Sequence, residues 1–281
     1  MTQQTKISVQ LINVTPALAE NYLKYNPVNR KVSKNNVAFL SQQMKSGLFV
    51  ENGESIVFDT ENILKDGQHR LLAIVKSGKS YHIPIVKGVR SVSMATYDTG
   101  KNRSAADVLS IYGFKNCNKI ASLIKSIDKY FKRKSKAVKV SSGARAETLS
   151  NQEVLEYTKD NYDWLTDMVK NSTNIYNKGN YNVLPISSIS LIAFIIGGKN
   201  PSNEVYNFLK HLIGVLRTEE TATSYLYNKL YNSKINKEPL NFYWVLGMSI
   251  KSWNYYVDGN PSVRYYTFKV GQELPTITKS R

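Results

Sequence analysis

The hydrophobic pattern of this chain changes near residue 103. Before that point, stretches that alternate apolar and polar residues lie between stretches whose apolar residues recur every three or four positions, which indicates a mixture of strands and helices. After that point only the helical spacing remains. The sequence therefore predicts an α+β protein, with an α/β domain at residues 1–103 and a mainly α-helical domain at residues 104–281.

Local signals define the expected elements. Thr15 is a capping residue followed by Pro16 at the first helical position, Ser33 is expected to cap a second helix, and Gly78 to end a third. In the first domain we expect strands at residues 6–14, 55–58 and 82–86 and helices at residues 15–25, 33–45 and 71–78. In the second we expect helices at residues 105–112, 119–132, 151–171, 184–196, 203–216, 222–231 and 240–256.

One segment has the residue types of a binding site. It reads Asp66-Gly67-Gln68-His69-Arg70 and lies where an expected strand gives way to an expected helix. A helix start presents backbone N–H groups and a favourable dipole to an anion, Gly67 allows close approach to the backbone, and Arg70 offers a planar cation. The segment predicts a phosphate site. The alternative is structural, with Asp66 as the helix N-cap, Gly67 as a turn residue and Arg70 as a surface charge.

The stretch from about residue 29 to residue 109 resembles the ParB/sulfiredoxin-like superfamily, and most closely its phage and bacterial members with an Asp-Gly-Gln-His-Arg motif. The matching segments, in order, are residues 29–33, 53–59, 64–71 and 98–104. This superfamily includes nucleotide-dependent DNA-partition clamps, sulfiredoxins, a free-serine kinase and nucleases. The resemblance thus implies an N-terminal ParB/sulfiredoxin-like α/β module with a nucleotide or phosphate site, without implying one reaction.

The resemblance also assigns roles to residues. It implies a phosphate-binding turn at Gly67, Gln68, His69 and Arg70, with Arg30 and Arg103 as further cations. His69, Asp66 and Glu54 are the implied catalytic candidates, and Glu51 is a second candidate for the acidic residue of the kinase branch. Gln68 stands where the sulfiredoxin branch has its reactive cysteine, so reduction of sulfinic acids is not expected.

The expected cofactor is a nucleoside triphosphate, ATP or CTP, with Mg²⁺. The ligand's own phosphates would hold the metal together with Asp66 or Asp98, since hard cations prefer oxygen ligands. A metal site built from a histidine or cysteine cluster is not expected, because the chain has three histidines and one cysteine. His82 and His211 are expected to be structural or surface residues.

The charge predicts a polyanionic partner. The chain has 38 Lys and Arg against 21 Asp and Glu, a formal net charge of +17. Residues 115–145 contain ten basic residues, and Asp128 is the only acidic residue among them. Those expected to contact DNA are Lys125, Lys129, Lys132, Arg133, Lys134 and Lys136. The alternative is that these side chains solvate the outer face of a helix whose inner face is Ile120, Leu123, Ile124, Ile127 and Phe131.

Other features narrow the class of protein. Cys117 is the only cysteine, so the chain has no internal disulfide. The polar start and the absence of a long apolar run predict a cytoplasmic protein without a membrane partner, in the host cytoplasm if a phage encodes it. Trp244, Trp253 and two neighbouring tyrosines fit either stacking on bases or the packing of a helix.

Two classes of function remain open. The first is a ParB-like protein that binds a nucleotide or another phosphorylated ligand and acts on or at DNA, as a nucleotide-dependent hydrolase or transferase with a role in DNA modification or counter-defence. The second is a non-catalytic DNA-binding accessory protein, or a ParB-like nuclease. The nuclease is disfavoured because the sequence shows no cluster of acidic residues near the motif that is able to hold two metals. A homodimer is also left open.

Overall fold

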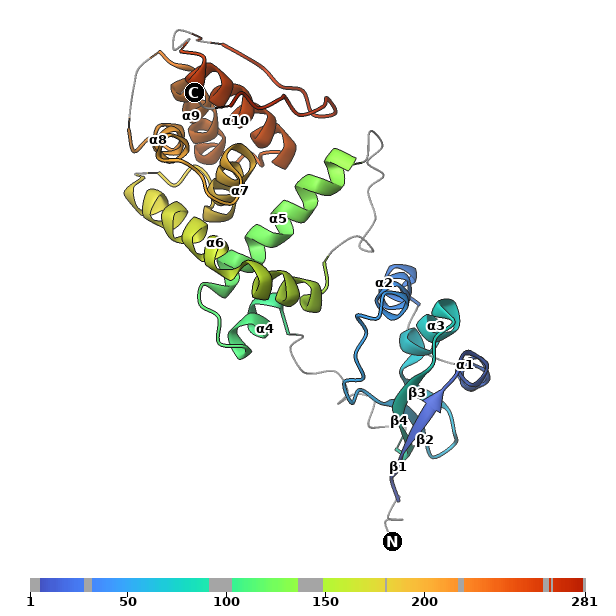
Figure 1. The fold of residues 1–281 in the computed structure, drawn as a ribbon. Helices are drawn as coiled ribbons and strands as arrows, with labels where there is room; N and C mark the ends of the chain where they lie inside the picture. Colours follow the sequence, from blue (N-terminus) through green and yellow to red (C-terminus); the bar gives the residue numbers. More distant parts are fainter. Residues whose placement is uncertain are drawn as a thin grey trace. The chain divides into compact units, whose positions relative to one another are not determined.

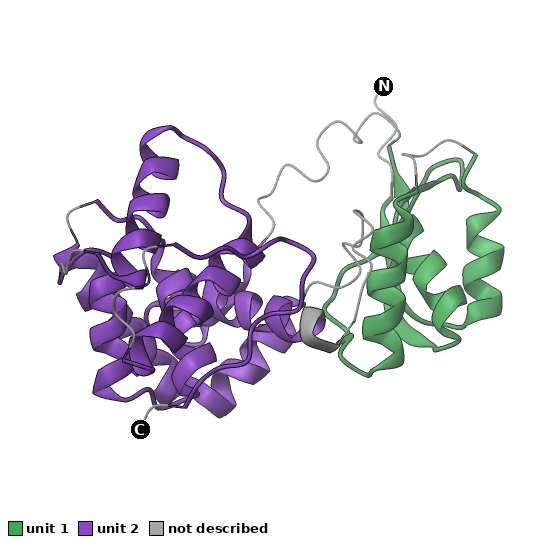
Figure 2. Ribbon diagram, turned by 90° about the horizontal axis from the view of Figure 1, so that it is seen from above, with its two compact units in different colours: residues 1–102, 141–148 green, residues 103–140, 149–281 purple. Residues whose placement is uncertain are grey.

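The structure is a computed structural model that describes residues 6–27, 32–90, 103–135, 149–179, 181–216, 220–259, 263 and 265–279. Within these residues the fold is mixed α+β, with four strands and ten helices (Figure 1). They form two compact units (Figure 2). We call residues 6–90 the N-terminal unit and residues 103–279 the helical unit, and each is described by itself.

The N-terminal unit closely follows the predicted order of strands and helices. Its elements are β1 (Ser8–Val14), α1 (Pro16–Leu23), α2 (Lys34–Lys45), β2 (Ile56–Asp59), β3 (Leu64–Asp66), α3 (Gln68–Ser77) and β4 (Tyr81–Val89). Thr15 and Ser33 cap α1 and α2 through their side chains, as expected, and Gly78 ends α3 in a left-handed conformation. The sequence did not predict β3, because three residues are too few to show an alternating pattern.

The four strands form one sheet in the order β1-β4-β2-β3. The pairs β1–β4 and β2–β3 are antiparallel, whereas β2 and β4 are parallel. Parallel neighbours need a crossover connection, and β3 followed by α3 provides it. The pentapeptide at residues 66–70 therefore lies inside the crossover between the two central strands.

The three helices of the N-terminal unit cover one face of the sheet (Figure 1). Alternate residues of the strands, among them Ile56, Phe58, Ile83 and Ile85, are buried against them. The helices contribute further buried residues, which are Ala19, Met44, Leu71, Ala73 and Ile74. This is a two-layer arrangement of a sheet and helices. The buried residues of α3 pack in the core and thereby fix the position of its first turn.

The helical unit contains seven helices in its described part. They are α4 (Ala105–Ile111), α5 (Cys117–Ser135), α6 (Asn151–Lys178), α7 (Ile186–Gly197), α8 (Asn203–Leu212), α9 (Ala222–Ile235) and α10 (Phe242–Val257). Ser104, Ser150 and Thr221 begin α4, α6 and α9 with capping boxes. Trp253 is buried against Phe208, so packing rather than base stacking accounts for it.

One prediction for the buried face of α5 is wrong. Ile120, Leu123, Ile124 and Ile127 are buried as expected, but Phe131 is 49% exposed. Tyr130 is buried instead. Residues three and four positions after Ile127 both lie near the inner face, and the core accepts the first of them. Phe131 makes edge-on contacts with the rings of Tyr130 and Phe194.

His211 lies on α8 beside the ring of Tyr256. Burial lowers the pKa of its imidazole below the ordinary value, and a hydrogen bond with the backbone of Leu216 opposes this effect. The residue is thus part of the packing of the helical unit, as expected from its apolar neighbours. None of the helices in the described ranges is long and apolar enough to cross a membrane.

Candidate functional site

Gly67 fixes the turn at which the candidate phosphate site begins. Its φ is 98°, and the first backbone bond of α3 runs from the Leu71 N–H to its carbonyl, at 2.9 Å. A Cβ at this position would lie 2.9 Å from Cγ1 of Ile56. Both the backbone conformation and the contact with β2 therefore require glycine. Asp66 does not cap the helix, since it ends β3 opposite Val57 and Gly67 is the N-cap residue.

Replacing Gly67 by alanine is expected to lower the free energy of unfolding by about 2–5 kcal/mol. The left-handed conformation contributes about 1–2 kcal/mol of this and the clash with Ile56 about 1–3 kcal/mol. Gly78→Ala is the matched control, because Gly78 has a φ of 71° and a Cβ there would meet no atom within 4 Å. Urea unfolding of both variants measures their free energies of unfolding, and the difference between them gives the contribution of the clash with Ile56. Equal losses of stability in the two variants would show that the clash contributes nothing.

Gln68 and His69 are buried and join the first turn of α3 to its neighbours. The Gln68 Oε1 accepts a hydrogen bond from Asn26 Nδ2 at 3.3 Å, in the segment after α1. The His69 Nε2 accepts one from the backbone N–H of Ser33 at 2.9 Å, at the start of α2. While it accepts this bond, Nε2 carries no proton. Proton exchange between Nε2 and a ligand would therefore have to replace the bond to Ser33.

His69→Ala is expected to lower the free energy of unfolding by about 1–3 kcal/mol, because it removes a buried ring and the partner of Ser33. His82→Ala is the control, since the His82 side chain is largely exposed and lies beside Glu51. It should change stability by about 0.5 kcal/mol or less. Thermal melting of both variants compares them. A His69→Ala variant as stable as wild type would instead favour a role in turnover.

Arg70 is the cation of the turn, and the structure holds it in place. Its Nη1 donates to the carbonyl oxygen of Ser55 at 2.8 Å, just before β2. Its Nη2 pairs with a carboxylate oxygen of Glu54. The Arg70 side chain is 12% exposed, whereas that of Glu54 is 64% exposed. These two contacts use two of the five N–H donors of the guanidinium group.

The pairing of Glu54 with Arg70 suggests how an anion would enter. A carboxylate oxygen and a phosphate oxygen make the same kind of bond to a guanidinium N–H. Because the Glu54 side chain is 64% exposed, solvent reaches its side of the ion pair with Arg70, and another anion can reach the same position. A phosphate could therefore replace Glu54 on Nη2 while Ser55 keeps Arg70 in position.

The other predicted residues divide between the units. Asp66 is half-buried beside the turn, and Glu51 accepts a hydrogen bond from the backbone N–H of His82 at 2.7 Å. Arg103 is exposed and belongs to the helical unit. Arg30 and Asp98 lie outside the described residues. Among the residues that the structure does describe, no three His, Cys, Asp or Glu side chains form a group that could hold a metal.

The candidate nucleic-acid interface is on α5. Lys125 and Lys129 are exposed and Lys132 is half-buried, and the spacing of four and three residues puts them on one face of the helix, opposite the buried Ile127. Asp128 pairs with Lys132 at 2.8 Å. The predictions for Arg133, Lys134 and Lys136 fall on side chains outside the described part of the structure. The geometry of α5 fits both predicted interpretations, because the lysines lie on the outside of a helix that is buried on its inner face.

Two aromatic residues that the sequence did not associate with this interface lie beside it. The ammonium nitrogen of Lys129 is 4.3 Å from the ring centroid of Phe242 and 5.6 Å from that of Tyr243, at the start of α10. The Tyr243 hydroxyl also lies 3.4 Å from the carbonyl oxygen of Lys129. These contacts hold Lys129 over the aromatic rings. No local signal could have revealed them, because Lys129 and Tyr243 are 114 positions apart in the chain.

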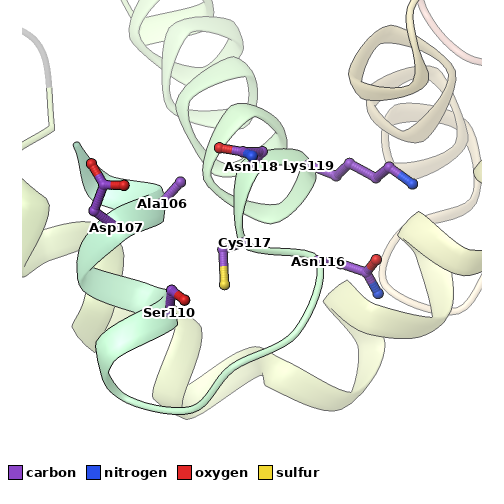
Figure 3. Close-up of a pocket in the computed structure, with 7 residues that line it drawn as sticks. All are labelled: Ala106, Asp107, Ser110, Asn116, Cys117, Asn118 and Lys119. Carbon is purple, nitrogen blue, oxygen red and sulfur yellow. The ribbon is translucent and has the colours of Figure 1, made fainter.

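A small pocket lies between α4 and the start of α5 (Figure 3). Cys117 points into it, and its thiol donates to the carbonyl oxygen of Phe114 at 3.1 Å. Asp107 belongs to the capping box of α4, and Lys119 donates to Thr173 Oγ1 at 3.2 Å. These three polar groups of the pocket are thus engaged in the packing of the helical unit, and none of the predicted site residues lines it.

Comparison with known proteins gives no assignment. No protein-family model, no curated protein and no solved structure matches this chain.

Proposed function

We propose that this chain is a ParB/sulfiredoxin-like protein that binds a nucleotide or another phosphorylated ligand at residues 67–70 and acts at DNA through α5. The observation that carries the proposal is the position of Arg70. Arg70 lies in the first turn of α3, and its guanidinium group donates to the carbonyl oxygen of Ser55. Its second contact is with the exposed carboxylate of Glu54. The ordered motifs around residues 66–70 support the proposed family, and the local geometry supports the proposed anion site.

The residues of the turn would share the work of binding. Gly67 makes the turn against Ile56, the dipole of α3 favours a negative group at the helix start, and Arg70 would bond phosphate oxygens. A nucleoside triphosphate would bring Mg²⁺ bound to its phosphates, and the half-buried Asp66 is the described carboxylate on the same turn. Binding and orientation of phosphates are what these side chains offer.

A panel of ATP, CTP, GTP and their diphosphates, with and without Mg²⁺, tests the ligand by thermal shift. A ligand that binds only the native state raises the melting temperature, by an amount that grows with its concentration. We expect at least one nucleotide to stabilise the wild type and none of them to stabilise Arg70→Ala to the same extent. A melting temperature that no phosphorylated ligand changes would contradict the proposal.

A second candidate function has its own support in the geometry. His69 is buried with Nε2 bonded to Ser33, so the residue that the motif offers for catalysis is engaged in structure. This favours a non-catalytic DNA-binding protein, in which the turn holds a backbone phosphate of the nucleic acid. Product analysis with the best nucleotide of the panel tests this, because a nucleotide-dependent hydrolase or transferase would turn the nucleotide over and a non-catalytic DNA-binding protein would not.

A further inference from the structure

In the described part of the chain, β1 is an edge strand of the sheet. β1 pairs with β4 on one side, from Ser8 opposite Lys87 to Val14 opposite Tyr81, without a bulge or a shift of register. No other strand of the described chain pairs with it. Figure 1 shows β1 at the outside of the sheet. Seven residues thus present one row of backbone N–H and C=O groups that no strand in the described ranges satisfies.

The face of the sheet next to this edge is apolar. The helices cover the face to which Ile12 and Val14 point. Side chains of alternate residues point the other way, and Ile7, Val9 and Leu11 are 57%, 62% and 69% exposed. Leu11 and Val9 lie opposite Pro84 and Val86 of β4, which extend the apolar surface.

The usual protection of an edge strand is missing from β1. Proteins that keep a sheet edge unpaired place charges, proline or a bulge on it, because an exposed apolar edge associates. The seven residues of β1 contain no charged residue and no proline, and their register with β4 is regular. A strand of this kind is built to be paired.

We propose that β1 pairs antiparallel with β1 of a second copy of this chain, about a twofold axis at Val9. In this register Val9 lies opposite Val9 of the second copy, and Ile7 opposite Leu11. The three apolar side chains of each copy then form one continuous cluster across the axis. On the other face Ser8 lies opposite Gln10, so polar residues also meet polar residues.

Other registers are less complementary. An axis at Gln10 places Ile7 opposite Asn13, and an axis at Leu11 places Val9 opposite Asn13, so that each leaves an apolar side chain against an amide. The charge of the chain limits which surfaces of two copies can meet. Two copies that each carry a formal charge of +17 repel one another over most of their surface, and the uncharged β1 allows contact without a like-charge pair.

Sedimentation velocity over a range of micromolar concentrations tests the pairing. Wild type is expected to form a dimer, and Val9→Lys to weaken it by at least about 100-fold, because two ammonium groups would meet at the axis. Val50→Lys is the matched control, since Val50 is also an exposed valine of the N-terminal unit, at 63%. It should leave the dimer intact. Circular dichroism melting confirms that the variants fold.

Disulfide trapping tests the register. Cys117→Ser removes the only native thiol, and Val9→Cys then places two cysteines opposite each other at strand-pair distance. Val9→Cys should cross-link fast, whereas Gln10→Cys and Val50→Cys should not. A monomeric wild type overturns the proposal. An extended segment of another protein would then be the expected partner of β1. A dimer that survives Val9→Lys, or a Val9→Cys variant that cross-links no faster than Val50→Cys, overturns it as well.

Discussion

Replacing Arg70 by alanine is expected to weaken binding of the phosphorylated ligand by roughly 10- to 150-fold, which corresponds to about 1.5–3 kcal/mol. The reason is that the variant removes a charge-assisted contact from a guanidinium that the Ser55 carbonyl already orients. Little side-chain entropy remains to be lost when the ligand binds, because the Arg70 side chain is held by two contacts and is 12% exposed. Isothermal titration calorimetry with the best ligand of the thermal-shift panel measures the change.

Two further variants make this result specific. Arg90→Ala removes the same charge from an exposed position after β4, and it should leave the affinity close to that of wild type. Glu54→Gln removes the carboxylate that occupies Nη2 of Arg70, and it should keep or raise the affinity for a phosphate that competes for this nitrogen. Unchanged affinity in a folded Arg70→Ala variant would show that residues 67–70 are a structural turn only.

The parts of the fold that the sequence predicted are those determined by neighbouring residues. Thr15 and Ser33 cap the helices that follow them, and Gly78 adopts the left-handed conformation at the end of α3. These features depend on contacts within three or four residues, which a local pattern records directly. The strand β3 was missed because it exists through its pairing with β2 and has too few residues to show a period.

The candidate site could be predicted only in part for the same reason. Its residue types and its place at a strand-to-helix junction are visible in the sequence. Its contacts are not, because Gln68 bonds to Asn26, His69 to Ser33 and Arg70 to Ser55 across 15 to 42 positions of the chain. The structure thereby adds a role that the motif did not reveal, since three consecutive side chains hold three other segments of the N-terminal unit together.

Changing Lys125, Lys129 and Lys132 together to glutamine is expected to have the largest effect on DNA binding. If each neutralises one phosphate, the log–log slope of affinity against salt should become less steep by about 0.9 per lysine, or about 2.7 in all. If wild type and variant bind DNA equally at about 1 M salt, the variant should bind roughly 500-fold more weakly than wild type at about 0.1 M salt. Fluorescence anisotropy at several salt concentrations between about 50 and 200 mM measures both quantities.

The control variant must lower the net charge of the protein by the same amount as the α5 variant, with substitutions outside α5. Lys45, Lys76 and Lys79 are exposed residues of the N-terminal unit, and changing all three to glutamine lowers the net charge by the same amount. If the lysines of α5 act through direct contact, only their variant changes the slope, because the contribution of distant charges is screened beyond about 10 Å. Equal effects in both variants would show that total charge attracts the DNA without a defined interface. A wild type that binds no DNA at low salt would remove α5 from the function altogether and leave its lysines as the solvated face of a packed helix.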